Sequence, residues 1–301
     1  MPICGLPICP MRLRPLLRFP EFPVILAPFI LFAPVLFGKA LFWGTPALQF
    51  HPWHVFAWET LISGQLPLWN PLSGLGAPLI ANYQSALFYP PNWIYFLLGA
   101  IGGETAGEPL MAWGMGLLAA AHLSLAGVGM VRLARELGLS ALAQTVSGLA
   151  FGLSGYLVAR AHFLSVNAAV AWLPWILWAS YRVASAGSVS AGSNPASDTP
   201  NPSKRIRDSV RFNALGISNT GFNRCLRLAF LVAILLLAGH AQTAWYTLLL
   251  AGAWVIFWGW NKHPRSSAFI RVLFLFILST ILGAALAAIQ LLPTAELLSQ
   301  S

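Results

Sequence analysis

The chain has 301 residues, of which 57% are hydrophobic and only 8% are charged, and its mean hydropathy is +0.71. This composition excludes an ordinary soluble domain and is typical of a membrane protein. The formal net charge of +9 is accounted for by cationic loops beside membrane spans, so we expect the lipid bilayer, and no nucleic acid, as a partner.

Several apolar segments reach the roughly 20 residues that cross a hydrocarbon core of about 30 Å. We therefore predict an all-α polytopic membrane protein with a single transmembrane domain. The segments 226–239 and 241–260 are predicted to form a tight, incompletely crossing hairpin, because one helix of their combined length would be too long for a bilayer. In chain order, the predicted spans are 22–42, 109–131, 140–159, 163–181, 226–239, 241–260 and 272–292.

A large loop, 43–108, separates the first two spans and lies within Ala40–Val131, which contains no Lys or Arg. Loops without cations are translocated, whereas cationic loops stay in the cytoplasm. We therefore predict that this loop faces the outside. It contains the apolar segment 86–101, in which two successive prolines leave a helical part of about ten residues, too short for a span.

If segment 86–101 lies along the outer surface, every Lys and Arg except Lys39 and Arg160 falls on the inner side. This distribution favours a cytoplasmic N-terminus in a multi-pass membrane protein. The cytoplasmic loop 182–225 is rich in Ser and Gly, which predicts a flexible connector whose cations are solvated or touch anionic lipid. Three cysteines (Cys4, Cys9 and Cys225) are predicted to be free thiols on this reducing side.

Of the eight acidic residues, two are candidate general bases, Glu59 and Glu296, and both are predicted to lie on the outer face. Glu59 belongs to a predicted interfacial helix from Pro52 to Gly64, in which it shares a narrow polar edge with Thr60 and Ser63. This helix and the helical part of 86–101 are the two expected surface helices. An alternative is that Glu59 only solvates its helix.

Further polar side chains of the outer face are candidate substrate-binding groups. Amides among aromatic rings suit sugar rings and polar headgroups, although Trp and Tyr also favour the membrane interface by themselves. A cation in an outward-facing turn suits a phosphate, or else interacts with lipid headgroups. The candidates are His51, Asn70, Asn82 and Gln84 in the loop, Arg160 and His162 in a turn, and His240 and Gln242 at the hairpin.

These segments together resemble the YfhO family of bacterial polytopic membrane proteins, over about residues 22 to 298. The motifs that carry the resemblance are Trp43-Gly-Thr-Pro-Ala-Leu-Gln-Phe-His-Pro-Trp53, Gly64-Gln-Leu-Pro-Leu-Trp-Asn-Pro71, Ala81-Asn-Tyr-Gln-Ser-Ala-Leu-Phe-Tyr-Pro-Pro-Asn-Trp93, Gly152-Leu-Ser-Gly155, Ala238-Gly-His-Ala-Gln242 and Gln290-Leu-Leu-Pro-Thr-Ala-Glu296. The chain is similar to the N-terminal portion of such proteins, which continue into further spans.

The resemblance implies a protein of the bacterial cytoplasmic (inner) membrane with a GT-C glycosyltransferase architecture. It also implies transfer of a sugar from a polyprenyl-phosphate carrier to a cell-envelope polymer. The chain departs from the family at one point, because many relatives have an Asp near the position of Thr45. GT-C enzymes generally rely on an acid in this loop, and here the well-placed acid is Glu59. Glu59 would deprotonate the acceptor for an inverting displacement, Arg160 or His240 would neutralise the leaving phosphate, and Asn82, Gln84 and Gln242 would orient the sugar. A divalent metal ion is compatible with this chemistry, although the sequence shows no ligand set and no other cofactor is evident.

Two other function classes remain open. A flippase or transporter for a lipid carrier would show related halves with ionisable groups near the bilayer midplane, and the sequence shows no internal repeat. A non-catalytic envelope-assembly protein would keep the fold without its catalytic acid.

Overall fold

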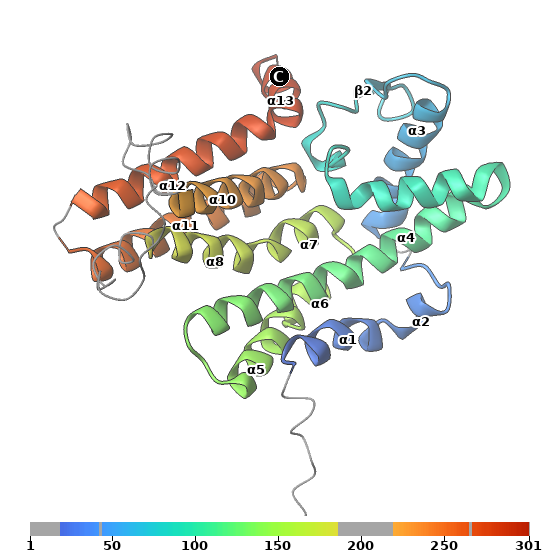
Figure 1. Cartoon of the computed structure of the whole chain (residues 1–301). Coiled ribbons are helices and arrows are strands. Elements are labelled where there is room, and N and C mark those ends of the chain that lie inside the picture. Colours follow the sequence, from blue (N-terminus) through green and yellow to red (C-terminus); the bar gives the residue numbers. More distant parts are fainter. Residues whose placement is uncertain (1–18, 42–43, 186–218, 265–266, 301) are drawn as a thin grey trace, which may run out of the picture.

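The computed structural model describes residues 19–41, 44–185, 219–264 and 267–300, and these form a helical protein (Figure 1). The described part has one small sheet, in which β1 (Trp69–Asn70) pairs antiparallel with β2 (Ala77–Pro78). The all-α prediction is therefore confirmed at the level of secondary structure. Residues 186–218, most of the predicted flexible loop, lie outside the described residues, as do Cys4 and Cys9.

Helices and helical turns make up most of the described chain. In chain order they are α1 (Glu21–Leu31), α2 (Ala33–Leu36), a π-helical turn (Pro46–Phe50), α3 (His51–Ile62), 3-10 turns (Tyr83–Ser85 and Pro90–Asn92), α4 (Trp93–Glu136), α5 (Ala141–Gly152), α6 (Gly155–Ala159), α7 (Leu164–Ala171), α8 (Leu173–Ala184), α10 (Asn219–Leu237), α11 (Ala241–Lys262), α12 (Ser267–Leu286) and α13 (Ala288–Ser299).

Three stretches in the described part are long and apolar enough to cross a membrane: Pro90–Glu136, Ala141–Ala159 and Ser267–Leu286. They overlap the predicted spans 109–131, 140–159 and 272–292. Length and composition thus support a membrane protein. The other four spans, and the orientation of all seven, stay predictions.

Several predicted spans are interrupted in the structure, and each break has a local cause. In the first, 22–42, helix α1 ends at Leu31 because Phe32 leaves helical geometry. The short α2 begins at the next residue and has a proline in its first turn. The span 140–159 breaks after Gly152, and Ser154 caps the next helix by accepting the N–H of Leu157. The span 163–181 divides into α7 and α8 ahead of a proline.

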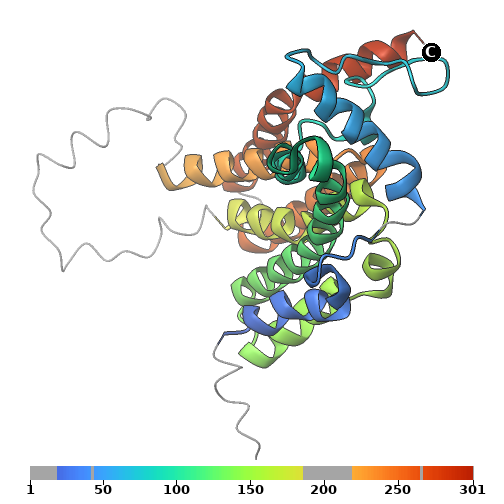
Figure 2. The ribbon, with the colours of Figure 1, turned by 90° about the vertical axis from the view of Figure 1, so that its right-hand side faces the viewer.

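Helix α4 is a hairpin rather than one rod, because Gly103 has φ 60° and ψ −154°, a conformation open essentially to glycine alone. Residues 93–102 fold back against the start of the long arm, at the far right of Figure 1. The arms approach closely, since a Cβ built on Gly107 would lie 2.8 Å from the carbonyl oxygen of Gly99 and 2.8 Å from the Trp58 ring. Figure 2 views the molecule from this hairpin end.

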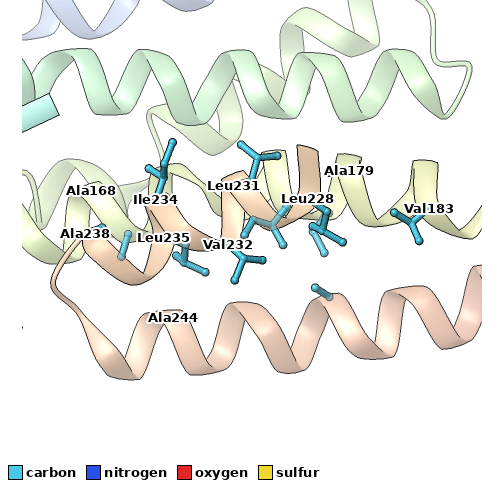
Figure 3. Close-up of a cluster of buried hydrophobic side chains, with 14 of the residues drawn as sticks. Ala168, Ala179, Val183, Leu228, Leu231, Val232, Ile234, Leu235, Ala238 and Ala244 are labelled. Carbon is cyan, nitrogen blue, oxygen red and sulfur yellow. The ribbon is translucent and has the colours of Figure 1, made fainter. Parts of the chain in front are cut away.

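The main core lies between α7, α8, α10, α11 and α12, and its buried side chains are mostly Leu, Val and Ala (Figure 3). Small residues bring the helices of the bundle together. A Cβ on Gly283 of α12 would lie 2.7 Å from the carbonyl oxygen of Ala229 on α10, and one on Gly127 of α4 would lie 2.9 Å from that of Gly148 on α5. Such close approach of backbones is typical of helix packing in membranes.

The cations of α4, α8, α10 and α11 gather at one end of the bundle, which we call the cationic end. Glu21 at the start of α1 pairs with Arg135 at 2.7 Å and lies 3.8 Å from Arg132, both near the end of α4. Other contacts link α4 to the end of α8, and the end of α8 to the start of α10 and the end of α11. Residues that are far apart in the sequence therefore share one charged face.

Candidate functional site

A groove of about 740 Å³ lies at the opposite end of the bundle from the cationic end, beside the turn between α10 and α11. The loop before α4 forms one wall and α13 forms another. Its polar lining residues are Tyr83, Gln84, His240, Gln242 and Thr294, and the rest of its lining is apolar. Three of the ten sequence-predicted site residues, Gln84, His240 and Gln242, are therefore brought together.

Local hydrogen bonds fix the loop wall of the groove. The Asn82 side chain accepts the backbone N–H of Gln84 at 3.1 Å and so caps the 3-10 turn Tyr83–Ser85. The Tyr83 hydroxyl donates to the carbonyl oxygen of Leu236 in α10. Gly239 has φ +82°, and a Cβ there would lie 2.8 Å from the carbonyl oxygen of Tyr83, so glycine allows the loop to rest on the helical turn. Asn82 thus has a structural role here.

His240 is the N-cap of α11 and presents its other ring nitrogen as a donor. Nδ1 accepts the backbone N–H of Thr243 at 3.2 Å, and the Thr243 hydroxyl lies 2.7 Å away. Partial burial, with a smaller contribution from the nearby positive charge of Arg160, lowers the pKa of His240. At neutral pH the ring is therefore uncharged, and the capping bond leaves the proton on Nε2.

Arg160 follows α6 and lies close enough to His240 for its charge to act on that ring. The guanidinium lies 5.7 Å from the ring centre of Tyr156 and 5.2 Å from that of Phe163. Within the described residues, no carboxylate lies within 4.0 Å of it. Arg160 is an exposed cation, held by aromatic faces, with its planar N–H donors available to an anion.

Two amides add uncharged donors and acceptors to the groove. The Gln84 Oε1 accepts from Gln49 Nε2 at 3.1 Å, which leaves the Gln84 NH₂ group as a donor. The Gln242 NH₂ group donates to the Tyr246 hydroxyl at 3.1 Å, which leaves its Oε1 as an acceptor. A ligand with both phosphate and hydroxyl groups would find both kinds of partner here.

Helix α13 supplies two groove-forming residues that sequence reasoning did not select. Thr294 lines the groove, and its hydroxyl donates to the carbonyl oxygen of Ala81 at 3.0 Å. Gln290, which is fully buried, donates to the carbonyl oxygen of Ile80 at 3.0 Å. Their spacing of four residues places both on one helix face. This spacing could have indicated that the face contacts another segment, but not which segment.

The remaining polar candidates lie elsewhere. His51 contacts the carbonyl oxygen of Glu108 at 3.3 Å, beside the α4 hairpin. The backbone carbonyl of His162 accepts from the Thr45 hydroxyl at 2.7 Å, which joins the start of the large loop to the turn after α6. Asn70 is buried, and its side chain accepts the N–H of Leu72 at 2.9 Å, so it shapes the turn after β1.

Neither candidate base lines the groove. Glu59 is exposed on α3, about 150° around the helix from the face that buries Ala57 and Trp58. Glu296 is exposed on α13, about 160° from Thr294 and Leu298, which do line it. The groove therefore combines neutral hydrogen-bonding groups, with Arg160 nearby and without these acids.

No group of three or more His, Cys, Asp or Glu side chains in the described part of the chain is arranged to hold a metal ion. The chemistry of the Nε2–H of His240, with the charge of Arg160 close to it, suits an anionic group, and that of the amides suits hydroxyl groups.

The described part of the chain is thus helical, with three helices apolar enough to cross a membrane and a groove lined by Gln84, His240 and Gln242 at one end of its bundle. Comparisons with family models, with curated proteins and with solved structures gave no match.

Proposed function

We propose that the chain is a membrane glycosyltransferase of GT-C type, which transfers a sugar from a polyprenyl-phosphate carrier to a cell-envelope acceptor on the extracytoplasmic face. The observation that carries the proposal is the convergence of Gln84, His240 and Gln242 on one groove, with the charge of Arg160 near enough to act on His240. Phosphate groups suit a guanidinium and an imidazole N–H, and sugar hydroxyls suit amides.

In this proposal, the carrier phosphate binds between Arg160 and the Nε2–H of His240. Both groups are donors at neutral pH, and both would stabilise the negative charge that develops on the phosphate as the glycosidic bond breaks. His240 would act as a donor and not as the base, because its Nδ1 is already engaged by Thr243.

The apolar part of the carrier has a matching feature nearby. A cavity of about 390 Å³ lies against the opposite face of α13, lined by apolar residues that include Leu61, Phe96 and Pro293. It is of the right chemistry for part of an isoprenoid chain, and it supports a lipid-linked substrate over a soluble one.

The base for the acceptor hydroxyl is proposed to be Glu59, or else Glu296, which lies on the side of α13 that borders this cavity. Because neither carboxylate lines the groove, the acceptor or a loop movement must bring the reacting groups together. The same observation favours a second candidate function, a non-catalytic envelope-assembly protein that binds the carrier without transferring its sugar.

The experiment is complementation of a strain that lacks the gene, with mass spectrometry of its envelope polymers. The wild-type gene should restore a sugar modification, and Arg160→Gln and Glu59→Gln should not, although both variants should insert in the membrane. If the double variant Glu59→Gln/Glu296→Gln restores the sugar modification and Arg160→Gln does not, the result would favour the non-catalytic protein that binds the carrier. Identical polymers with and without the gene would contradict a transferase.

A further inference from the structure

A second group of cations lies at the cationic end, far from the groove. Arg182 near the end of α8 and Arg227 near the middle of α10 lie over the same indole, 5.3 Å and 5.7 Å from the ring of Trp178. Arg224, one turn before Arg227, donates from Nη1 to the carbonyl oxygen of Arg182 at 2.9 Å. Two guanidinium groups from two helices are thereby held over one aromatic side chain, and a third is bonded to the backbone beside them.

The charges of this cluster are not balanced within the described part of the chain. Its one nearby carboxylate, Glu136, lies 4.0 Å from Arg182 and accepts from the Trp178 indole N–H at 3.2 Å. Three positive charges therefore face one negative charge. Arg182 and Arg227 also lie within electrostatic range of Arg224, where they repel it.

The hydrogen bonding of the cluster is also incomplete. The Nε atom of Arg224 is buried and has no acceptor among the described residues. A buried donor without a partner costs free energy, and an anion would offset both this cost and the repulsion. Phosphate oxygens match the planar fork of N–H donors that guanidinium groups present.

We propose that Arg182, Arg224 and Arg227 form a binding site for a phosphate group, carried by an anionic lipid headgroup or by a soluble phosphate compound. Arg227 is exposed and Arg182 is partly exposed, so the site is open at its surface. Along α10, Arg224 lies about 20 Å and Arg227 about 15 Å from Leu237, the helix end that borders the groove. The site is therefore separate from the proposed carrier site and does not depend on it.

The test uses the full chain in nanodiscs and the double variant Arg182→Gln/Arg227→Gln. Its matched control is Arg132→Gln/Arg271→Gln, which removes the same charge from two exposed cations outside the cluster. The probes are dioleoylphosphatidylglycerol, dioleoylphosphatidylcholine and inorganic phosphate, measured by native mass spectrometry and lipid competition. Thermal unfolding of both variants serves to check that they remain folded.

We expect the phosphatidylglycerol to be retained over the phosphatidylcholine. The cluster variant should lose about 30-fold in affinity for it, since each cluster guanidinium removed takes with it a charge-assisted hydrogen bond to the phosphate, worth about fivefold or more. The control should lose several-fold less. Competition by millimolar inorganic phosphate would identify a soluble phosphate compound as the ligand. A lack of competition would identify a lipid headgroup as the ligand. Equal losses in both variants, or no preference for the anionic lipid, would overturn the proposal.

Discussion

The imidazole Nδ1 of His240 accepts the backbone N–H of Thr243 at 3.2 Å, so one side chain both begins α11 and fixes which ring nitrogen carries the proton. The same ring lines the groove. Helix capping and ligand binding are thereby joined in one residue, and two substitutions can separate them.

His240→Asn should keep the cap, because Asn is a favourable N-cap, and should lose the Nε2–H donor. We expect thermal stability close to that of the wild type, with a loss of about tenfold in affinity for undecaprenyl phosphate. His240→Ala should lose both affinity and about 1 kcal/mol of stability. Differential scanning fluorimetry and lipid binding would measure the two effects, and unchanged affinity in His240→Asn would show that the ring only caps α11.

The buried His54 should make the stability of the folded protein depend on pH. It is buried in α3, where its Nε2–H donates to the carbonyl oxygen of Ser85 at 2.7 Å and the Tyr95 hydroxyl lies 3.1 Å from Nδ1. Burial lowers its pKa from 6.5 to about 4. The unfolded chain therefore binds a proton more readily, and stability should fall between pH 6.5 and 4 by an amount on the order of 3 kcal/mol.

The measurement is chemical unfolding in detergent at several pH values, with His54→Gln as the test variant. Whatever its stability at pH 7, His54→Gln should show a shallower decline over this pH range. An unchanged slope would mean that His54 is solvated and not buried against Tyr95.

The α4 hairpin can be tested by adding a single methyl group. In Gly107→Ala the new Cβ would meet the Gly99 carbonyl oxygen and the Trp58 ring, both at 2.8 Å, so we expect a loss of about 1–3 kcal/mol. Gly155→Ala is the control, because nothing lies within 4 Å of its Cβ. Equal midpoints of thermal unfolding for the two variants would argue that the arms of α4 do not pack together.

The orientation can be tested with single cysteines in a variant that otherwise lacks them. Leu75, between β1 and β2, and Leu139, between α4 and α5, are both exposed. An impermeant thiol reagent should label position 75 in intact cells and position 139 only after permeabilisation. The reverse pattern would place the groove in the cytoplasm and contradict the proposed function.

Sequence patterns predicted the helical class and the break at Gly239-His240, because hydropathy and glycine are local signals. They also selected Gln84, His240 and Gln242, which meet in one groove. They did not reveal the fold-back at Gly103 or the contact of α13 with residues 80 and 81. Such contacts depend on backbone carbonyls and on the fit between distant segments, which leave no periodic mark in the sequence.

The central claim is that Arg160 binds the phosphate of a lipid carrier, and the affinity of the nanodisc-embedded protein for undecaprenyl phosphate tests it most directly. Arg160→Gln would be compared with Arg271→Gln, both in the Arg182→Gln/Arg227→Gln background, so that phosphate held at the cationic end does not contribute. We predict a loss of tenfold or more in Arg160→Gln, because it removes a charge-assisted contact, and a change below twofold in Arg271→Gln. Equal affinities of the two variants would contradict the account.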